Sequence, residues 1–243
     1  MIEVRGLNKS FGAQPVLENV SFHIENGESV AIIGRSGGGK SVLLKHIIGL
    51  LQPDAGAVLV DGENIVAMNE RQLLRVRRKF GMVFQGAALF DSMTVAENVA
   101  FGLRRHEHLT EAEIAKRVAA ALDMVDLPGT EDKNPAELSG GMRKRVGLAR
   151  AIIYEPQIVL YDEPTTGLDP IVSDSIDKLI IRVRDHLKVT SIVVTHDMRS
   201  ARRVGNHVLM LHERKIHANC TPEALFASTD PVVRQFVDGV ADP

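Results

Sequence analysis

A glycine-rich segment with the sequence Gly-Arg-Ser-Gly-Gly-Gly-Lys-Ser, residues 34–41, constrains the fold of this chain more than any other stretch. It follows a short apolar run at residues 29–33 and opens a helical pattern, which is the context that G-x-x-x-x-G-K-[ST] requires. The backbone N–H groups of such a loop turn inward around phosphate oxygens, Lys40 reaches the terminal phosphates, and the Ser41 hydroxyl is placed for Mg²⁺. The predicted nucleotide contacts are Gly34, Ser36, Gly37, Gly38, Gly39, Lys40, Ser41 and Val42. The alternative, a glycine-rich turn that matches by chance, is weakened by the flanking strand and helix.

Further apolar runs predict strands that are buried on both faces. They lie at residues 81–84, 158–161 and 191–195, and like the run at 29–33 they are apolar almost throughout instead of alternating. That pattern is typical of a parallel sheet covered by helices. The opening segment instead predicts antiparallel strands joined by a hairpin at a Gly-Ala-Gln-Pro turn, residues 12–15. A mixed sheet is therefore expected beside an α/β core.

Helical patterns dominate between residues 85 and 151. The clearest begins at Thr110, which has capping-box spacing with Glu113 and is followed by apolar residues at helical intervals. This stretch is the candidate inserted lobe of an otherwise α/β chain. A shorter helical pattern lies around residues 224–226 in the tail.

Two adjacent carboxylates end the apolar run Ile-Val-Leu-Tyr-Asp-Glu at residues 158–163. Ligands bind at the carboxyl ends of strands in such sheets. We expect Asp162 to hold Mg²⁺, directly or through water, and Glu163 to polarise the attacking water as general base. The alternative is a solvated acidic turn.

A second glycine pair lies in Leu-Ser-Gly-Gly-Met, residues 138–142, just before a helical pattern. Ser139 is placed as an N-cap, and capping alone would explain it. Capping does not explain Gly140 and Gly141, each of which lowers helix propensity by about 1 kcal/mol but lets an anion approach exposed N–H groups. The segment predicts a second phosphate-binding helix start.

These motifs, in this order, resemble those of ATP-binding subunits of ABC transporters over nearly the whole chain. Residues 138–142 resemble the ABC signature LSGGQ, upstream of the acidic pair as that family requires. The resemblance implies a P-loop NTPase (RecA-like) core with an N-terminal antiparallel β subdomain and an inserted α-helical subdomain. It implies one nucleotide-binding domain over residues 1–243, in which 1–86 and 151–243 form the core and 87–150 the helical signature subdomain. It also implies ATP and Mg²⁺ as cofactors and ATP hydrolysis as the reaction.

Further site residues follow from this resemblance, position by position. Phe11 is placed like the aromatic that stacks on adenine, although a core aromatic would look the same in the sequence. Gln85 resembles the glutamine that reaches the metal and the attacking water, and His196 resembles the histidine that contacts the γ-phosphate. Asp169 lies in a segment like the one that contacts the opposite subunit. Outside this order, a lone His after a strand is usually a packed or capping residue.

The family architecture implies several partners. Two copies of the chain would sandwich two ATP molecules, each between the phosphate loop of one copy and the signature of the other. A groove beside Gln85, bordered by the helical lobe, would receive a coupling helix from an integral membrane permease. The segment at residues 84–99 and the ending at 230–239 are similar to those of Mla-type (Mce-associated) phospholipid-trafficking ATPases. That branch implies an MlaE-like permease, an Mce-type lipid-binding protein and a STAS-like regulator at the cytoplasmic face of the inner membrane.

Some features limit these expectations or favour alternatives. Some Mla ATPases extend beyond the equivalent of Gly239 with a tail that grips the opposite subunit, and the residues up to Pro243 offer little for such a grip. The alternative is an importer ATPase for a small solute such as an amino acid. Only 47 residues follow His196 (243 minus 196), too few for the regulatory domain of many sugar- and methionine-type importer subunits, although amino-acid importer subunits are equally short. A non-hydrolysing scaffold is opposed by the presence of both Glu163 and His196.

Charge and hydropathy argue against a nucleic-acid partner and a direct membrane span. The formal net charge is -2, so no global positive field favours nucleic acid, and a DNA- or ribosome-associated ATPase would have a long coiled-coil insertion or tandem cassettes. The basic clusters at residues 77–79 and 143–145 are expected to be solvated, the second also helping to bind phosphate. The most apolar stretch, residues 42–51, is interrupted by Lys45 and His46. The single cysteine, Cys220, gives no sign of an oxidising compartment.

Overall fold

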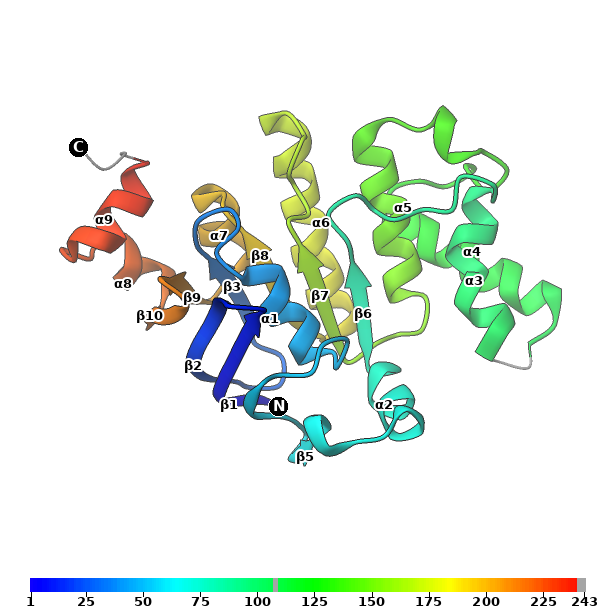
Figure 1. Cartoon of the computed structure of the whole chain (residues 1–243). Coiled ribbons are helices and arrows are strands. Elements are labelled where there is room, and N and C mark those ends of the chain that lie inside the picture. Colours follow the sequence, from blue (N-terminus) through cyan, green and yellow to red (C-terminus); the bar gives the residue numbers. More distant parts are fainter. Residues whose placement is uncertain (107–108, 240–243) are drawn as a thin grey trace. The chain divides into compact units, whose positions relative to one another are not determined.

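The computed structural model describes residues 1–106 and 109–239. The chain divides into two compact units: unit 1 comprises Met1–Arg77 with Thr190–Pro243, and unit 2 comprises Arg78–Val189 (Figure 1). The expected assignment of residues 87–150 to a helical subdomain stays a prediction. Among the described residues, no helix combines the length and the apolar character needed to cross a membrane.

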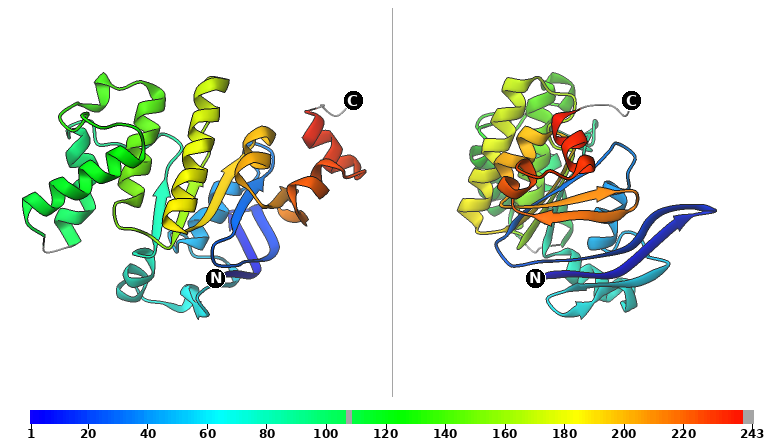
Figure 2. Two further views of the ribbon diagram at one scale, coloured as in Figure 1. Left: turned by 180° about the vertical axis from the view of Figure 1, so that it is seen from behind. Right: turned by 90° about the vertical axis from the view of Figure 1, so that its left-hand side faces the viewer.

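Unit 1 opens with an antiparallel sheet. Its strands follow the order β2-β1-β4-β5 and comprise β1 (Ile2–Phe11), β2 (Gln14–Ile24), β4 (Ala55–Val60) and β5 (Glu63–Asn64). The predicted hairpin is confirmed, but its turn is shorter than expected, because Pro15 already pairs with Ser10 within the ladder. The long paired strands are seen side by side in the right-hand view of Figure 2.

The parallel strands of unit 1 carry the glycine-rich segment. Strand β3 (Ser29–Ile33) lies between β8 (Thr190–Thr195) and β9 (His207–His212) and runs parallel to both, while β10 (Lys215–Cys220) is antiparallel to β9. Every residue of β3 and β8 is buried. The helices α1 (Lys40–Ile47) and α7 (Met198–Val204) pack on these strands, which explains why both sequences are apolar without alternation.

Two short elements follow the antiparallel sheet and complete residues 1–77, the first of the two stretches of chain in unit 1. They are the 3-10 turn η1 (Ile65–Ala67) and helix α2 (Glu70–Arg77). Arg77 donates hydrogen bonds to the carbonyls of Ile48 (3.3 Å) and Gly49 (2.7 Å), which follow the last turn of α1. A cation at this position is favourable because the C-terminus of a helix carries negative partial charge. Arg77 is therefore structural and not simply solvated.

The tail of unit 1 folds back onto its parallel strands. Helix α8 (Pro222–Phe226) is capped by Thr221, and α9 (Pro231–Asp238) is capped by Asp230. The predicted helix around residues 224–226 is confirmed. Leu225 and Val233 pack in a buried cluster that includes Ile33, the last residue of β3. Residues 240–243, considered above for a dimer grip, lie outside the described residues.

Unit 2 contains a pair of parallel strands with several helices. Strand β6 (Phe80–Val83) is parallel to β7 (Ile158–Asp162). The helices are α3 (Val95–His106), α4 (Glu111–Met124), α5 (Gly140–Ile152) and α6 (Pro170–Leu187), with the 3-10 turn η2 (Pro135–Glu137) before α5. The predicted capping box of α4 is present, since Thr110 and Glu113 exchange side-chain and backbone hydrogen bonds. Helix α5 is central to the unit, because it packs on β6, α3, α4 and α6.

Candidate functional site

In unit 1 the expected site residues lie at the carboxyl ends of two paired parallel strands. Ile33, the last residue of β3, is in register with Thr195, the last residue of β8. The phosphate loop therefore begins at the same edge where His196 follows β8. Sheet edges of this kind are where α/β proteins bind ligands.

The conformation of the phosphate loop depends on its glycines. Gly34 has φ +155° and lies so close to Leu211 that a Cβ atom would be 2.4 Å from the Leu211 carbonyl oxygen. Gly39 has φ +94°, and a Cβ there would lie 3.0 Å from Val16. A side chain at Gly34 would therefore displace backbone, and one at Gly39 would be strained by the positive φ and pressed against Val16. Helix α1 begins immediately afterwards, at Lys40.

Lys40 lies inside this loop. Its side chain is buried, and Nζ donates to the carbonyl oxygens of Gly34 (2.9 Å) and Arg35 (3.1 Å). The ammonium is thus held against the first two residues of the loop that a phosphate is expected to enter. Ser41 and Val42 follow in the first turn of α1 and are half-buried. The arrangement fits an anionic ligand, because the loop, the helix N-terminus and the ammonium all offer positive charge.

His196 neither packs in the core nor caps the following helix, the two usual roles of a histidine after a strand. The residue is exposed, so it is not packed in the core. Helix α7 is capped by Asp197, whose Oδ1 accepts from the N–H groups of Arg199 (2.8 Å) and Ser200 (3.3 Å). The capping role therefore belongs to Asp197. Contact of His196 with a γ-phosphate stays a prediction.

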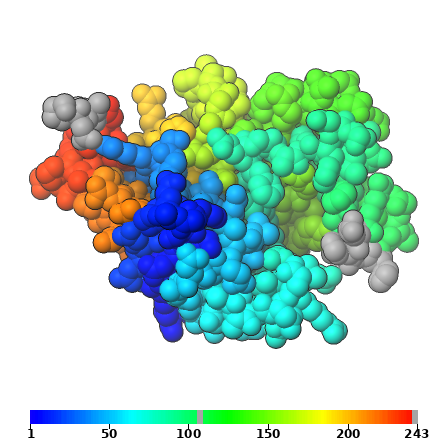
Figure 3. Space-filling model, viewed as in Figure 1, coloured from blue at the N-terminus to red at the C-terminus, as the bar shows by residue number. Residues whose placement is uncertain are grey.

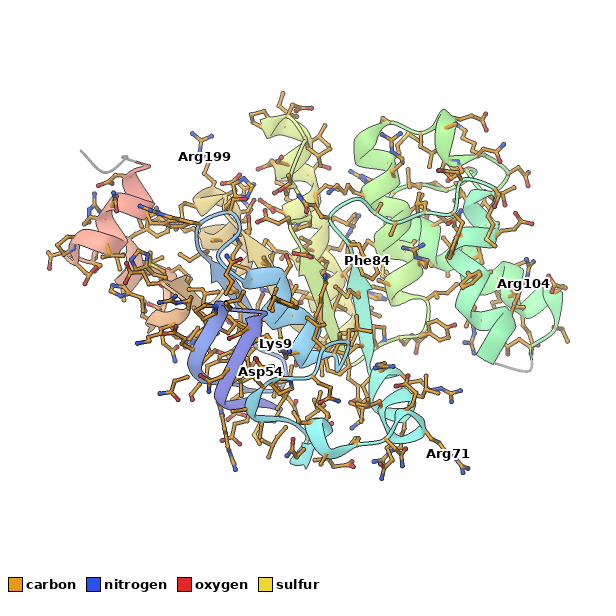
Figure 4. All side chains as sticks on the ribbon, viewed as in Figure 1. Lys9, Asp54, Arg71, Phe84, Arg104 and Arg199 are labelled. Atoms are coloured by element: carbon orange, nitrogen blue, oxygen red, sulfur yellow. The ribbon has the colours of Figure 1, made fainter. Side chains whose placement is uncertain are left out.

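Phe11 is the last residue of β1 and is 50% exposed, so the alternative of a core aromatic is wrong. The ring belongs to the hairpin whose surface is dark blue in Figure 3. The ammonium of Lys9 lies 5.5 Å from the ring centroid, and Lys9 is itself paired with Asp54 at 2.8 Å (both labelled in Figure 4). An exposed ring beside a fixed cation can stack on a flat ligand. Its stacking on adenine stays a prediction.

Unit 2 repeats the arrangement of unit 1 at a second pair of strand ends. Val83, the last residue of β6, is in register with Tyr161 of β7. Gln85 therefore lies just beyond the end of one strand, at the edge where Asp162 ends the other and Glu163 follows it. Both acidic residues are 8% exposed, so the alternative of a solvated acidic turn is wrong. Gln85 is exposed.

Glu163 is held in an uncommon conformation by its neighbours. Its φ of +50° lies in the left-handed region, which is rare for residues other than glycine. The hydroxyl of Thr166 donates to Glu163 Oε2 at 2.9 Å, and the Thr166 N–H reaches the Glu163 carbonyl at 3.3 Å. These bonds fix the direction of the carboxylate. The sequence placed Thr166 only in the segment before Asp169 and gave no sign of this role.

The signature segment is shaped by packing as well as capping. Ser139 is the N-cap of α5, as predicted, and its Oγ accepts from the Met142 N–H at 3.2 Å. A Cβ on Gly141 would lie 2.7 Å from Val172 of α6, whereas a Cβ on Gly140 would meet only Leu168, at 3.5 Å. Gly141 is therefore needed for the approach of α6. Anion binding by this helix start stays a prediction.

Asp169 has a structural role that sequence reasoning did not anticipate. It is the N-cap of α6, and its Oδ1 accepts from the N–H groups of Ile171 (2.9 Å) and Val172 (3.0 Å). Pro170 at the first helical position is pre-organised for the same start. The expected contact of Asp169 with a second subunit stays a prediction.

The basic cluster at residues 143–145 is not uniformly solvated. Lys144 is only 8% exposed, and its Nζ donates to the carbonyl oxygens of Gln85 and, at 3.4 Å, Glu163. Burial lowers the pKa of this amine, while the carboxylates of Glu163 and Asp162 act in the opposite direction. The expectation of a solvated face is therefore wrong for Lys144, because three residues bearing like charge need not share one helix face.

Mg²⁺ was expected to use Ser41, Gln85 and Asp162. Among the described residues, no cluster of three or more His, Cys, Asp or Glu side chains could hold a metal ion. The expected donors are instead one hydroxyl, one amide and one carboxylate. Oxygen donors of these kinds suit Mg²⁺, which in nucleotide sites uses few protein oxygens together with water and phosphate. Their binding of one shared ion stays a prediction.

Comparison with known proteins identifies the family. The family described as ABC transporter matches residues 17–166. A probable ribonucleotide transport ATP-binding protein, mkl, of Mycobacterium leprae (strain TN) is 44% identical over 98% of this chain and 69% of its own length, so the chain spans about two thirds of that relative. The intermembrane phospholipid transport system ATP-binding protein MlaF of Escherichia coli (strain K12) is 41% identical over 100% of this chain and 90% of its own length.

Solved structures agree with the sequence relatives. The dimeric post-hydrolysis structure of the ATP-binding cassette MJ0796, bound to ADP and Pi, has a TM-score of 0.84 and 32% identity and covers 91% of this chain and 99% of that one. The predicted α/β cassette fold and the resemblance to ATP-hydrolysing transporter subunits are thereby confirmed. This chain belongs to the ABC transporter family, as one of its ATP-binding, ATP-hydrolysing subunits.

Proposed function

We propose that this chain hydrolyses ATP as a homodimer that drives phospholipid transport through a membrane permease. The observation that carries the nucleotide chemistry is the buried ammonium of Lys40 inside a loop that leaves no room for a side chain at Gly34. Lys40 binds the terminal phosphates, and the N–H groups of residues 34–41 surround their oxygens. Phe11 supports the adenine.

The remaining residues position the reaction. Ser41, Asp162 and Gln85 would hold Mg²⁺, which supplies charge neutralisation at the phosphates when bound. Glu163 polarises the attacking water, with its carboxylate oriented by the Thr166 hydroxyl. His196 contacts the γ-phosphate from the strand end beside the phosphate loop.

The deciding experiment for the reaction is Glu163→Gln. Turnover should fall at least about 100-fold while ATP binding is kept, because the amide cannot accept a proton from water. Phosphate release and binding of a fluorescent ATP analogue measure the two effects. Glu213→Gln is the control, since that carboxylate is 84% exposed. Near-normal turnover in Glu163→Gln would remove Glu163 as the base.

The dimer is proposed from the family resemblance of the signature segment and from the dimeric state of a similar cassette. Ser139, Gly140 and Gly141 of one copy would meet the ATP held by the other copy, and the similar cassette MJ0796 is dimeric. Glu163→Gln with ATP should therefore elute as a dimer in size-exclusion chromatography with light scattering. Adding Gly140→Asp should abolish the dimer by repelling phosphate, whereas Gly140→Ala should keep it, since a Cβ there makes an ordinary 3.5 Å contact.

A hollow in unit 2 supports docking of the permease. It has a volume of about 530 Å³ and is lined by Ser92, Met93, Glu97, Phe101 and Arg104. The Phe101 ring packs against that of Phe90, with the centroids 4.6 Å apart and the planes tilted by 39°, and Phe90 is 42% exposed. Apolar groups rimmed by charges suit an amphipathic helix. Figure 4 labels Arg104, one of the lining residues.

The lipid substrate rests on the relatives and on residues 84–99. The name of the Escherichia coli relative refers to intermembrane phospholipid transport. We propose the same substrate class here, with an MlaE-like permease, an Mce-type protein and a STAS-like regulator at the cytoplasmic face of the inner membrane. Affinity purification from the native cell tests this. Recovery of a periplasmic amino-acid-binding protein in place of an Mce-type protein would favour the importer alternative.

A further inference from the structure

One face of the signature helix α5 holds the turn that follows Gln85. Lys144, Gly147 and Arg150 are spaced three residues apart and so lie on one side of the helix. Lys144 Nζ donates to the Gln85 carbonyl, while Arg150 Nη2 and Nη1 donate to the carbonyls of Ala87 and Ala88, each at 2.7 Å. The backbone carbonyls of Gln85, Ala87 and Ala88 thus each accept a hydrogen bond from a cationic side chain of α5.

Gly147, which lies between these two cations on α5, allows the turn to approach the helix closely. A Cβ at this position would lie 3.3 Å from the Ala87 Cβ and 3.4 Å from its carbonyl oxygen. Ala87 itself is 1% exposed, so the turn is packed onto the helix as well as hydrogen-bonded to it. The helix and the turn therefore contact each other without intervening side chains at this point.

The turn needs such support because its backbone is strained. Ala87 and Ala88 have φ of +60° and +49°, in the left-handed region that residues with a Cβ disfavour. Strained backbone persists only where surrounding contacts over-determine it. The contacts from α5 supply that restraint, and Gln85 is set at the start of the restrained turn.

The same ammonium also reaches the general base. Lys144 Nζ lies 3.4 Å from the Glu163 carbonyl, so one buried cation joins the backbones of Gln85 and Glu163. A buried cation keeps its hydrogen-bond acceptors, because leaving them unpaired is costly. The geometry points to a clamp: we propose that Lys144, Gly147 and Arg150 fix Gln85 and Glu163 to the signature helix, so that movement of this helix sets both residues at once. This rests on the proposed function.

Kinetics of charge-removing variants test the clamp. In Lys144→Met and Arg150→Met we expect kcat to fall about 10-fold or more with KM for ATP within about 2-fold, since misplacement of catalytic groups lowers the rate more than binding. Lys144→Arg should restore part of the rate. Arg145→Met is the matched control, because it lies on the same helix and loses the same charge. The structure engages the Arg145 guanidinium with Val125, Asp126 and Ser175, away from Gln85 and Glu163, in place of the phosphate contact expected for its cluster. Equal rate losses in Arg145→Met and Lys144→Met would overturn the proposal.

A double-mutant cycle separates positioning from general damage. If Lys144 acts through Gln85, Lys144→Met should cost much less in a Gln85→Ala background than alone, because interacting residues are not additive. Independent, additive losses would contradict the clamp. Gly147→Ala, which leaves every charge in place, should lower kcat in the same way by pressing on Ala87.

Amide hydrogen exchange tests the clamp without any reaction. The amides of residues 85–88 should exchange faster in Lys144→Met and Arg150→Met than in the parent chain and in Arg145→Met. Unchanged exchange would sink the proposal even if the chain is an active ATPase. Faster exchange in a chain without ATPase activity would uphold the clamp and reject the proposed function.

Discussion

The two pairs of parallel strands solve the same problem in different ways. In unit 1, β3 and β8 end at a loop whose shape is fixed by glycines and by the ammonium of Lys40 within it. In unit 2, β6 and β7 end at residues that are held by side chains from elsewhere in the sequence, Lys144 and Thr166. The phosphate-binding end is thus locally determined, whereas the carboxylate end depends on contacts distant in the chain.

The largest effect is expected for ATP binding when the charge of Lys40 is removed from the glycine-rich loop. Lys40→Met should weaken ATP binding by about 100-fold or more, because a charged hydrogen bond to phosphate contributes about 1.5–3 kcal/mol and the loop loses its cation. Titration with a fluorescent ATP analogue measures it. Lys45→Met, an exposed lysine of the same helix, is the control. Similar affinity in both variants would show that the loop backbone alone binds phosphate.

A backbone clash should come next. Gly34→Ala should lower the free energy of unfolding by more than about 2 kcal/mol, because its Cβ would meet the Leu211 carbonyl at 2.4 Å. Gly12→Ala isolates the clash, since Gly12 also has positive φ (+58°) but nothing within 4 Å of the added Cβ. Urea unfolding compares the two. Equal losses would mean that φ alone sets the requirement for glycine.

A smaller effect on kcat is expected when the hydrogen bond from Thr166 to Glu163 in unit 2 is removed. Thr166→Val keeps the shape but removes the donor to Glu163, so kcat should fall about 10-fold with unchanged KM, as for the loss of one hydrogen bond to a charged group. Thr166→Ser, which keeps the hydroxyl, should be nearly normal. If Thr166→Val changes KM and not kcat, the hydroxyl does not orient the base.

The smallest effect concerns pH and unit 1. His46, on α1, is buried, and desolvation lowers its pKa from the ordinary value of 6.5. Because the pKa is lower in the folded chain, the unfolded chain binds the proton first as the pH falls. The free energy of unfolding is therefore unaffected by His46 above pH 6.5 and decreases as the pH drops below that value. His46→Leu should flatten this slope between pH 7.5 and 5.5 in urea unfolding. An unchanged slope would assign the acid sensitivity to other groups.

Sequence patterns predicted the parts of the molecule that local chemistry determines. The strands expected at residues 29–33 and 158–161, the capping box at Thr110 and the N-cap at Ser139 all followed from nearby residues, and the structure contains each of them, with the second strand one residue longer than expected. The role of Lys144 could not be predicted, because its partners are backbone carbonyl groups 59 and 19 residues away. Every residue has a backbone carbonyl, so no residue type in the sequence marks such a partner. Gly141 was attributed to anion binding alone, since the approach of Val172 is invisible before folding.

The bonds from Lys40 to its own loop have a consequence for the thermodynamics of nucleotide binding. Since the ammonium already donates to two carbonyls of the loop, the chain meets the entropic cost of ordering this side chain when it folds. In the proposed binding mode, ATP would replace these neutral acceptors by anionic ones, so binding would be an exchange of hydrogen-bond partners. We therefore expect the affinity for ATP to weaken with rising ionic strength more than with small changes in loop flexibility.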